Sequence, residues 1–190
     1  MARCDWALTG GPSIGDAYLR YHDEVWGVPE RAPHELFEFL ILEGAQAGLS
    51  WSTILRKLDG YRRAYDVFDA EVIARYGDSD VARLLADGGI VRNRTKVAAS
   101  IRNAQAWLEI DDPAGYLWGF TDGVVIQNAW PDMAAVPAET EQSQAMSRDL
   151  KQRGFGFVGP TICYAFMQAT GMVNDHIITC FRHRECAGLA

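Results

Sequence analysis

The stretch that decides the fold is "PHELFEFLILEGAQAGLSW", residues 33–51. Six of the seven positions from Leu36 to Leu42 are apolar, which is too continuous for the one-sided pattern of a surface helix. Pro33 suits the first turn of a helix, and the acidic Glu43 ends the apolar run. The pattern predicts a helix that is buried on nearly all sides, so further helices must surround it.

Other segments supply those helices. Apolar residues recur at helical spacing in two neighbouring segments, one with Val81, Leu84 and Leu85 and one with Val97, Ile101, Ala104 and Leu108. Pro160 and Gly171 bracket another helix, with Ile162, Phe166 and Met167 on one face. A further helix is expected over 141–153, closed by Gly154, and 119–137 is expected to be loop with a short strand. The predicted fold class is all-α.

Composition limits the classes of protein that fit. An apolar content of 48% and a charged content of 23% are typical of a globular protein. No apolar run reaches the length of a membrane span, and the first residues lack the apolar core of a signal peptide, so a cytoplasmic protein is expected. The net charge of −7 argues against nucleic-acid binding through bulk charge, but it leaves room for a local basic face.

Four cysteines in a reducing compartment indicate buried thiols or metal ligands before disulfides. In "NDHIITC" (174–180), Asn174 suits a helix N-cap, and His176 and Cys180 then share one face of the turn that follows. A tetrahedral site needs two more donors. They are either His183 and Cys186 nearby or Cys4 and His22 near the other end of the sequence, and spacing does not choose between them. Ordinary buried thiols are the third alternative.

A second motif is "LLADGGIVRNRTK", residues 84–96. Gly88 and Gly89 permit a tight turn between two helices and bring backbone N–H groups toward a phosphate, while Ile90 fills the turn from inside. An ordinary hairpin of two helices is the commoner interpretation. The basic residues Arg92, Arg94 and Lys96 favour a DNA contact, which would hold the duplex without distinguishing its sequence and would weaken with salt.

Longer stretches of the sequence carry a resemblance. "RCDW" (3–6), "YHDEVWGVP" (21–29), "LFEFLILEGAQAGLSW" (36–51) and "RGFGFVGPTICYAFMQATGMVNDH" (153–176) resemble the DNA-3-methyladenine glycosylase I family. These bacterial helix-hairpin-helix enzymes remove N3-methyladenine from alkylated DNA. The resemblance extends from Arg3 to about Cys180 and weakens over 119–152. It implies an all-α helix-hairpin-helix glycosylase fold as one unit, 1–190, in which about 33–110 carries the hairpin and about 1–32 and 111–190 form a zinc-joined part.

The resemblance also implies a metal. It assigns one structural Zn²⁺, joining the N- and C-terminal segments, to Cys4, His22, His176 and Cys180. Two thiolates and two imidazoles fill a tetrahedral shell and leave no position for a water nucleophile. His183 and Cys186 are then bystanders.

The same resemblance assigns the pocket. Glu43 accepts hydrogen bonds from the extruded base, although by its residue type alone an acid after an apolar run is more often a solvated helix end. The aromatic walls are Tyr21, Trp26 and Trp51, with Trp6 as an additional wall. Gln46 and Leu49 are candidates for the wedge that fills the gap in the duplex, and the alternative for Leu49 is a cap on the core. Ala45 stands where related enzymes often carry Gln, so no role is given to it.

The expected chemistry is hydrolysis without a lyase step. Methylation at N3 makes the adenine a cation, so the base leaves readily and needs an electron-rich pocket more than acid catalysis. No lysine is placed for Schiff-base chemistry, and Asp111 and Asp112 receive no role because the family lacks the usual catalytic Asp. The implied partner is double-stranded alkylated DNA, with no membrane and no obligate protein partner, and a monomer is expected. Two alternatives are a non-catalytic, zinc-joined sensor of alkylated DNA and a small-molecule zinc hydrolase, which needs an open metal position.

Overall fold

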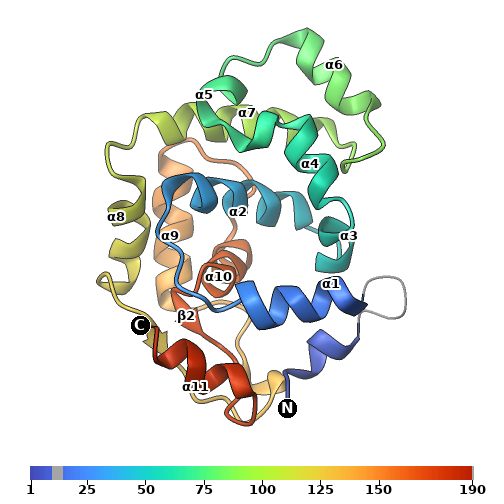
Figure 1. Ribbon diagram of the computed structural model, residues 1–190. Helices are drawn as coiled ribbons and strands as arrows, with labels where there is room; N and C mark the ends of the chain where they lie inside the picture. Colours follow the sequence, from blue (N-terminus) through green and yellow to red (C-terminus); the bar gives the residue numbers. More distant parts are fainter. Residues whose placement is uncertain (10–14, 190) are drawn as a thin grey trace.

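Helix α2, Pro33–Gln46, runs through the centre of the molecule with other helices around it (Figure 1). The computed structural model describes residues 1–9 and 15–189. Every residue from Leu36 to Ala45 is buried except Phe39, which is half-buried. Pro33 occupies the first turn, where its missing N–H leaves no hydrogen bond unmade. The buried helix predicted from the apolar run is therefore confirmed.

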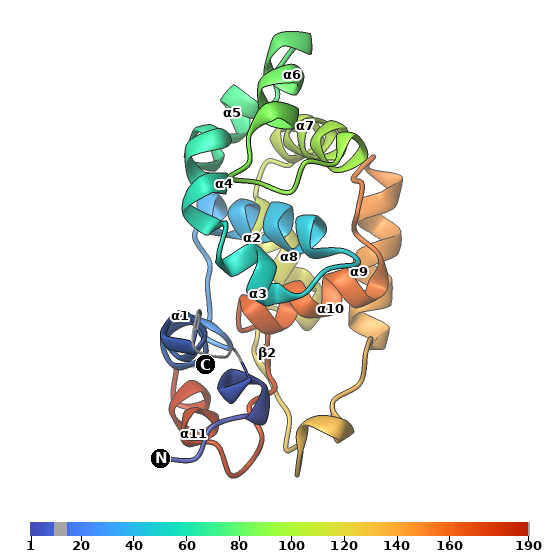
Figure 2. The ribbon, with the colours of Figure 1, turned by 90° about the vertical axis from the view of Figure 1, so that its right-hand side faces the viewer.

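Short helices and one pair of strands make up the described chain. In sequence order they are η1 (Asp5–Leu8), α1 (Gly15–Arg20), η2 (Tyr21–Val25), α2, α3 (Trp51–Leu55), α4 (Leu58–Ala64), η3 (Asp66–Phe68), α5 (Ala70–Ile73), α6 (Asp78–Ala86), α7 (Arg94–Leu108), α8 (Pro113–Trp118), η4 (Gly119–Thr121), β1 (Ile126–Gln127), η5 (Met133–Ala135), α9 (Glu141–Gln152), α10 (Pro160–Ala169), β2 (Val173–Asn174) and α11 (Phe181–Ala187). Helices α3, α7, α8 and α10 contact α2, and α10 also packs on α9 (Figure 2). The all-α prediction is confirmed.

Helix α7 buries only part of the face that was predicted. Val97 and Ala104 are buried as expected, but Ile101 is half-buried and Leu108 lies exposed at the helix end. Two polar residues take their places on the buried face. Ser100 donates to the Val97 carbonyl, and the Asn103 side chain bonds both backbone groups of Gly156, at 2.7 and 3.0 Å. Because these hydrogen bonds satisfy the buried polar atoms, polar residues belong to the buried face, and the apolar pattern alone predicted that face only in part.

The segment 174–180 is not helical, so the helix predicted there is wrong. Strand β2 ends at Asn174 and pairs in parallel with β1, the short strand expected within 119–137. Instead of capping a helix, the Asn174 amide donates to Gln127 at 2.8 Å and to the His183 carbonyl at 2.9 Å. The next helix, α11, begins at Phe181. Because β1 lies far away in the sequence, the local spacing of residues around Asn174 could not predict this pairing.

The two ends of the described chain meet. The Phe181 N–H donates to the Ala2 carbonyl at 3.0 Å, and a small hydrophobic cluster forms around Cys4, Ile177 and Cys180. Both views show this junction at the opposite end of the molecule from the hairpin of α6 and α7 (Figures 1 and 2). The main hydrophobic core includes residues of helices from α2 to α10. It therefore contains residues of both the expected hairpin-bearing part (about 33–110) and the expected zinc-joined part (about 111–190). No described helix has the length and apolarity to cross a membrane.

Candidate functional site

Cys4, His22, His176 and Cys180 gather at the junction of the chain ends. Their donor atoms lie within 4.8 Å of one another, and all four residues are fully or almost fully buried. Cys4 precedes η1, His22 lies in η2, His176 follows β2 and Cys180 caps α11. His183 and Cys186 are not in this group among the described residues, and His183 bonds the Asn128 carbonyl instead. His176 and Cys180 are therefore grouped with Cys4 and His22, not with the nearby His183 and Cys186.

The distances suit a tetrahedral ion. The Sγ atom of Cys180 lies 3.5 Å from His22 Nε2 and 3.6 Å from His176 Nδ1, and the Sγ of Cys4 lies 3.6 Å from His176 Nδ1. Metal bonds of about 2.3 Å to sulfur and 2.05 Å to nitrogen at a tetrahedral angle place S and N about 3.6 Å apart. The donor set fits zinc in both chemistry and spacing.

Outer hydrogen bonds orient both histidines for this role. His22 Nδ1 lies 2.7 Å from Asp23 Oδ1, and His176 Nε2 lies 2.9 Å from the Trp26 carbonyl. Each acceptor takes the N–H of its imidazole, so the other nitrogen carries the lone pair that a metal needs. Arg3 holds Asp23 in turn, at 2.7 Å. A hydrogen bond from Cys4 lowers the pKa of the Cys180 thiol, which favours the thiolate that a metal requires.

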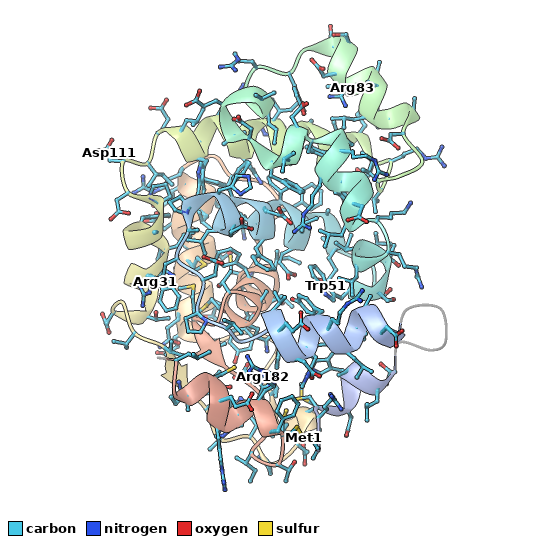
Figure 3. The ribbon with its side chains drawn as sticks, viewed as in Figure 1. Met1, Arg31, Trp51, Arg83, Asp111 and Arg182 are labelled. Atoms are coloured by element: carbon cyan, nitrogen blue, oxygen red, sulfur yellow. The ribbon has the colours of Figure 1, made fainter. Side chains whose placement is uncertain are left out.

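A pocket of about 310 Å³ lies between this cluster and α2. Its volume is at the lower end of small-molecule sites, roughly 300–1,000 Å³. Aromatic residues enclose it, and Trp6, Tyr21, Trp26 and Trp51 all line it as predicted. The ring centroids of Tyr21 and Trp51 are 5.0 Å apart, and those of Trp6 and Trp26 are 5.2 Å apart. Figure 3 shows Trp51 between helices α3 and α1.

Glu43 places its carboxylate in this pocket from the last turn of α2. It is 2% exposed, so the alternative of a solvated helix end is wrong. Burial raises the pKa of Glu43 from its usual 4.5 to about 8. Within the described chain, Glu43 Oε2 and Trp51 Nε1 are buried polar atoms without a hydrogen-bond partner. Such atoms are rare in folded proteins, and two in one pocket wall indicate a ligand with both a donor and an acceptor.

Sequence reasoning missed four lining residues: Tyr18, Met133, Ala165 and Gln168. Tyr18 had a usable signal, because it lies three residues before Tyr21 and so shares a helix face with it. Met133 lies in η5, inside the segment expected to be loop. Ala165 and Gln168 lie on α10, and nothing in the local pattern separates them from core residues.

The segment after α2 lies at the mouth of the pocket. Gln46 lines the pocket and is half-buried, while Leu49 is 42% exposed. Leu49 is therefore not among the buried core residues. Lys96 approaches this segment from α7 and donates to the carbonyls of Ala45 and Ala47, at 2.7 and 2.6 Å. These bonds compensate carbonyls left open at the end of α2.

The α6–α7 turn only partly matches its predicted geometry. Ile90 is buried, Gly88 is exposed, and a Cβ on Gly60 would collide with the Gly89 carbonyl. The Gly89 N–H, however, donates to the Asp87 carboxylate at 2.6 Å, so it does not point freely at a phosphate. Arg92 and Arg94 are exposed.

Asp111 and Asp112 lie away from the pocket. Asp111 is exposed, and Figure 3 places it on the opposite side of the molecule from Trp51. Asp112 accepts a hydrogen bond from the Gly115 N–H at 2.9 Å and caps α8. Both positions agree with the expectation that neither residue is catalytic.

An aromatic lining around one buried acid suits a flat, electron-poor ring. The chain belongs to the methyladenine glycosylase family, whose model matches residues 13–183. It is therefore a hydrolase of N-glycosyl compounds.

Relatives agree along nearly the whole length. The chain is 43% identical to DNA-3-methyladenine glycosylase 1 of Escherichia coli (strain K12), over 95% of this chain and 96% of the relative. A crystal structure of a 3-methyladenine DNA glycosylase I superimposes with a TM-score of 0.90 at 46% identity, covering 95% of this chain and 98% of the other. Another, a tyrosine-to-phenylalanine variant in complex with 3-methyladenine, has a TM-score of 0.89 at 32% identity and covers 95% and 97%.

Proposed function

We propose that this protein binds double-stranded alkylated DNA, extrudes N3-methyladenine into the aromatic pocket and hydrolyses its N-glycosidic bond to leave an abasic site. The observation that carries the proposal is that two buried polar atoms, Glu43 Oε2 and Trp51 Nε1, have no hydrogen-bond partner in an aromatic pocket of about 310 Å³. A relative with the same fold has been crystallised with 3-methyladenine. In this proposal the protein acts in the cytoplasm and as a monomer.

Charge explains the selectivity for methylated bases. In the empty pocket Glu43 is largely protonated near neutral pH, because burial raises its pKa to about 8. A cationic base favours the carboxylate, so binding releases the proton and forms a buried ion pair. The surrounding rings attract the cation by roughly 0.5–2 kcal/mol each. Unmodified adenine is neutral and gains neither interaction.

The bond then breaks because N3-methylated adenine leaves as a neutral base. Glu43 and the DNA phosphates stabilise the positive charge that develops on the sugar, and water completes the hydrolysis. No lysine lines the pocket among the described residues, and Lys96 and Lys57 bond carbonyls elsewhere, Lys96 those at the end of α2 and Lys57 that of Gly88 at 2.7 Å. A Schiff-base lyase step is therefore not expected.

The duplex lies across the face that joins the hairpin and the pocket mouth. In this proposal α6 and α7 form a helix-hairpin-helix motif, and the exposed Arg92 and Arg94 contact the phosphates. Leu49, which is 42% exposed, and Gln46 fill the gap that the extruded base leaves.

A zinc ion held by Cys4, His22, His176 and Cys180 has a structural role. When bound, it supplies four coordinate bonds that join the two ends of the chain, and no chemistry to the substrate. Trp26 depends on this junction, because its carbonyl accepts from His176 and its ring lies 4.6 Å from the imidazole, centroid to centroid. The zinc centre therefore stabilises one wall of the pocket.

The test is release of the base. A duplex carrying N3-methyladenine is incubated with the protein, and free base and abasic sites are counted by chromatography and by cleavage in alkali. We expect equal amounts of both, with no strand breaks before alkali. Glu43→Gln should lower release at least ~100-fold, whereas Glu109→Gln, at an exposed position, should not. Binding of the lesion without release would favour a sensor, and a cobalt-substituted protein that shows a metal-bound water would favour a zinc hydrolase.

A further inference from the structure

Asp175 carries a fully buried carboxylate next to the pocket. Its Oδ1 accepts from Asn128 Nδ2 at 2.7 Å and from Trp130 Nε1 at 2.8 Å. Its Oδ2 accepts from the Tyr164 hydroxyl at 2.6 Å and from Gln168 Nε2 at 2.7 Å. Four donors satisfy a buried carboxylate, so every group that faces Asp175 must be a donor.

This requirement fixes which way the Gln168 amide points. An amide turned by 180° would set its oxygen against a carboxylate oxygen, which would replace a charge-assisted hydrogen bond with repulsion. The NH₂ group therefore faces Asp175, and Oε1 faces the other way. Oε1 takes no hydrogen bond from any described residue, and it is not one of the buried polar atoms that lack a partner, so it remains accessible. The side chain itself lines the pocket.

The backbone holds Gln168 equally firmly. Its carbonyl accepts from the Gly27 N–H at 3.0 Å, which ties α10 to the residue after Trp26. The pocket thus has two oxygen acceptors from different elements, the Glu43 carboxyl on α2 and the Gln168 amide oxygen on α10.

We propose that Gln168 Oε1 accepts a hydrogen bond from the amino group of the extruded base, and that Asp175 positions it to do so. The inference rests on the proposed function and adds to it a specificity for the purine 6-position. A 6-amino group is a donor, whereas a 6-oxo group is an acceptor that would meet Oε1 with repulsion. Glu43 and the rings select the charge of the lesion, and Gln168 selects adenine over 6-oxo purines with the same methyl group.

The test compares two bases in two proteins. Free 3-methyladenine and free 3-methylhypoxanthine, which has a 6-oxo group, are titrated into the protein while tryptophan fluorescence is followed. Gln168→Met removes the acceptor and keeps the length of the side chain. We expect it to weaken binding of 3-methyladenine by about 10-fold and to leave 3-methylhypoxanthine unchanged or slightly tighter. Gln152→Met, an exposed glutamine at the end of α9, is the matched control and should change neither.

Three outcomes overturn the inference. Equal weakening of both bases by Gln168→Met would mean that the residue only supports the pocket. An unchanged affinity for 3-methyladenine would mean that Oε1 meets no donor. Equal binding of the two bases by the unaltered protein, which needs no variant, would show that the 6-position is not distinguished. If the unaltered protein released no base from alkylated duplex, the proposed function itself would fail. Failure of the Gln168 inference can therefore be distinguished from failure of the proposed function.

Discussion

The Cys/His cluster at the chain ends and the α6–α7 turn are both recognisable by residue type, yet the structure treats them differently. All four donors of the cluster are buried, and both imidazoles are oriented by a second hydrogen bond. At the turn, Arg92 and Arg94 are exposed. The imidazoles of the cluster already have these partners within the chain, so their orientation is set before any ion arrives. Arg92 and Arg94 make no side-chain hydrogen bond or ion pair with another described residue, so nothing in the described chain fixes how they point.

Lys96 shows where this difference matters. By charge it belongs with Arg92 and Arg94, and the sequence predicts that it contacts DNA. By its hydrogen bonds it belongs with α2, since its ammonium donates to the carbonyls of Ala45 and Ala47. Residues of the same charge in one stretch of sequence can therefore have different roles, depending on whether the fold buries them. The following experiments test that separation, beginning with the largest effect expected.

Removing a ligand from the cluster should have the largest effect on stability. Cys180→Ser should lose the metal and lower Tm by ~10 °C or more, since three buried donors are left without an ion. Metal content by atomic emission and Tm by calorimetry are measured on the same sample. A chelator should lower the Tm of the unaltered protein and leave the variant unchanged. A variant that keeps its full zinc content would show that the ligand set is wrong.

Glu43 should make activity depend on pH. If the carboxylate form binds the cation, kcat/KM should rise about tenfold per pH unit below pH 8 and level off above it, since burial raises the pKa of Glu43 to about 8. Glu43→Gln should remove the slope. A flat profile in the unaltered protein would mean that proton release from Glu43 does not accompany binding.

The same group should set a pH-dependent stability. Burial raises the pKa of Glu43 from 4.5 to about 8, so between these values the folded state holds a proton that the unfolded state has lost. Its contribution is present below pH 4.5 and is lost as pH rises through 8. Above pH 8, Glu43→Gln should be more stable than the parent by ~1 kcal/mol or more, or about 2–4 °C in Tm, and the gap should close in acid. An equal gap at all pH values would contradict this.

Lys96→Met should lower both stability and excision, because the segment that carries Gln46 and Leu49 loses two hydrogen bonds. We expect a loss of about 1–3 kcal/mol in the free energy of unfolding, measured by urea titration. Arg92→Met provides the exposed control and should stay within ~0.5 kcal/mol of the parent. Equal stability of the two variants would return Lys96 to the group of DNA-binding residues.

Arg92→Ala together with Arg94→Ala should have the smallest effect on the protein itself. Tm should not move, while affinity for DNA should fall by a similar factor for every sequence. The slope of log affinity against log salt should flatten by about 0.9 for each phosphate that the variant no longer neutralises. Weakening confined to particular sequences would rule out a phosphate-only role.

Sequence and resemblance together predicted most of the site. Spacing left two donor sets open, and the resemblance chose Cys4 and His22, which the structure places beside His176 and Cys180. The apolar run predicted the burial of α2 correctly. What failed were features set by distant partners: the strand at 173–174, which needs β1, and the polar part of the buried face of α7, where Asn103 bonds Gly156. Gln168 was missed because its orientation depends on Asp175, an interaction that has no signature in local spacing.

The junction of the chain ends has a mechanical consequence. Phe181 bonds Ala2, and a metal ion held by the cluster would join Cys4 to Cys180 and close the 175 residues between them into a loop. A molecule pulled by its ends in an optical trap would load this closure first, while helix α2 and the base pocket felt no tension until the closure broke. If the cluster holds a metal ion, removing that ion should lower the force at which the closure breaks.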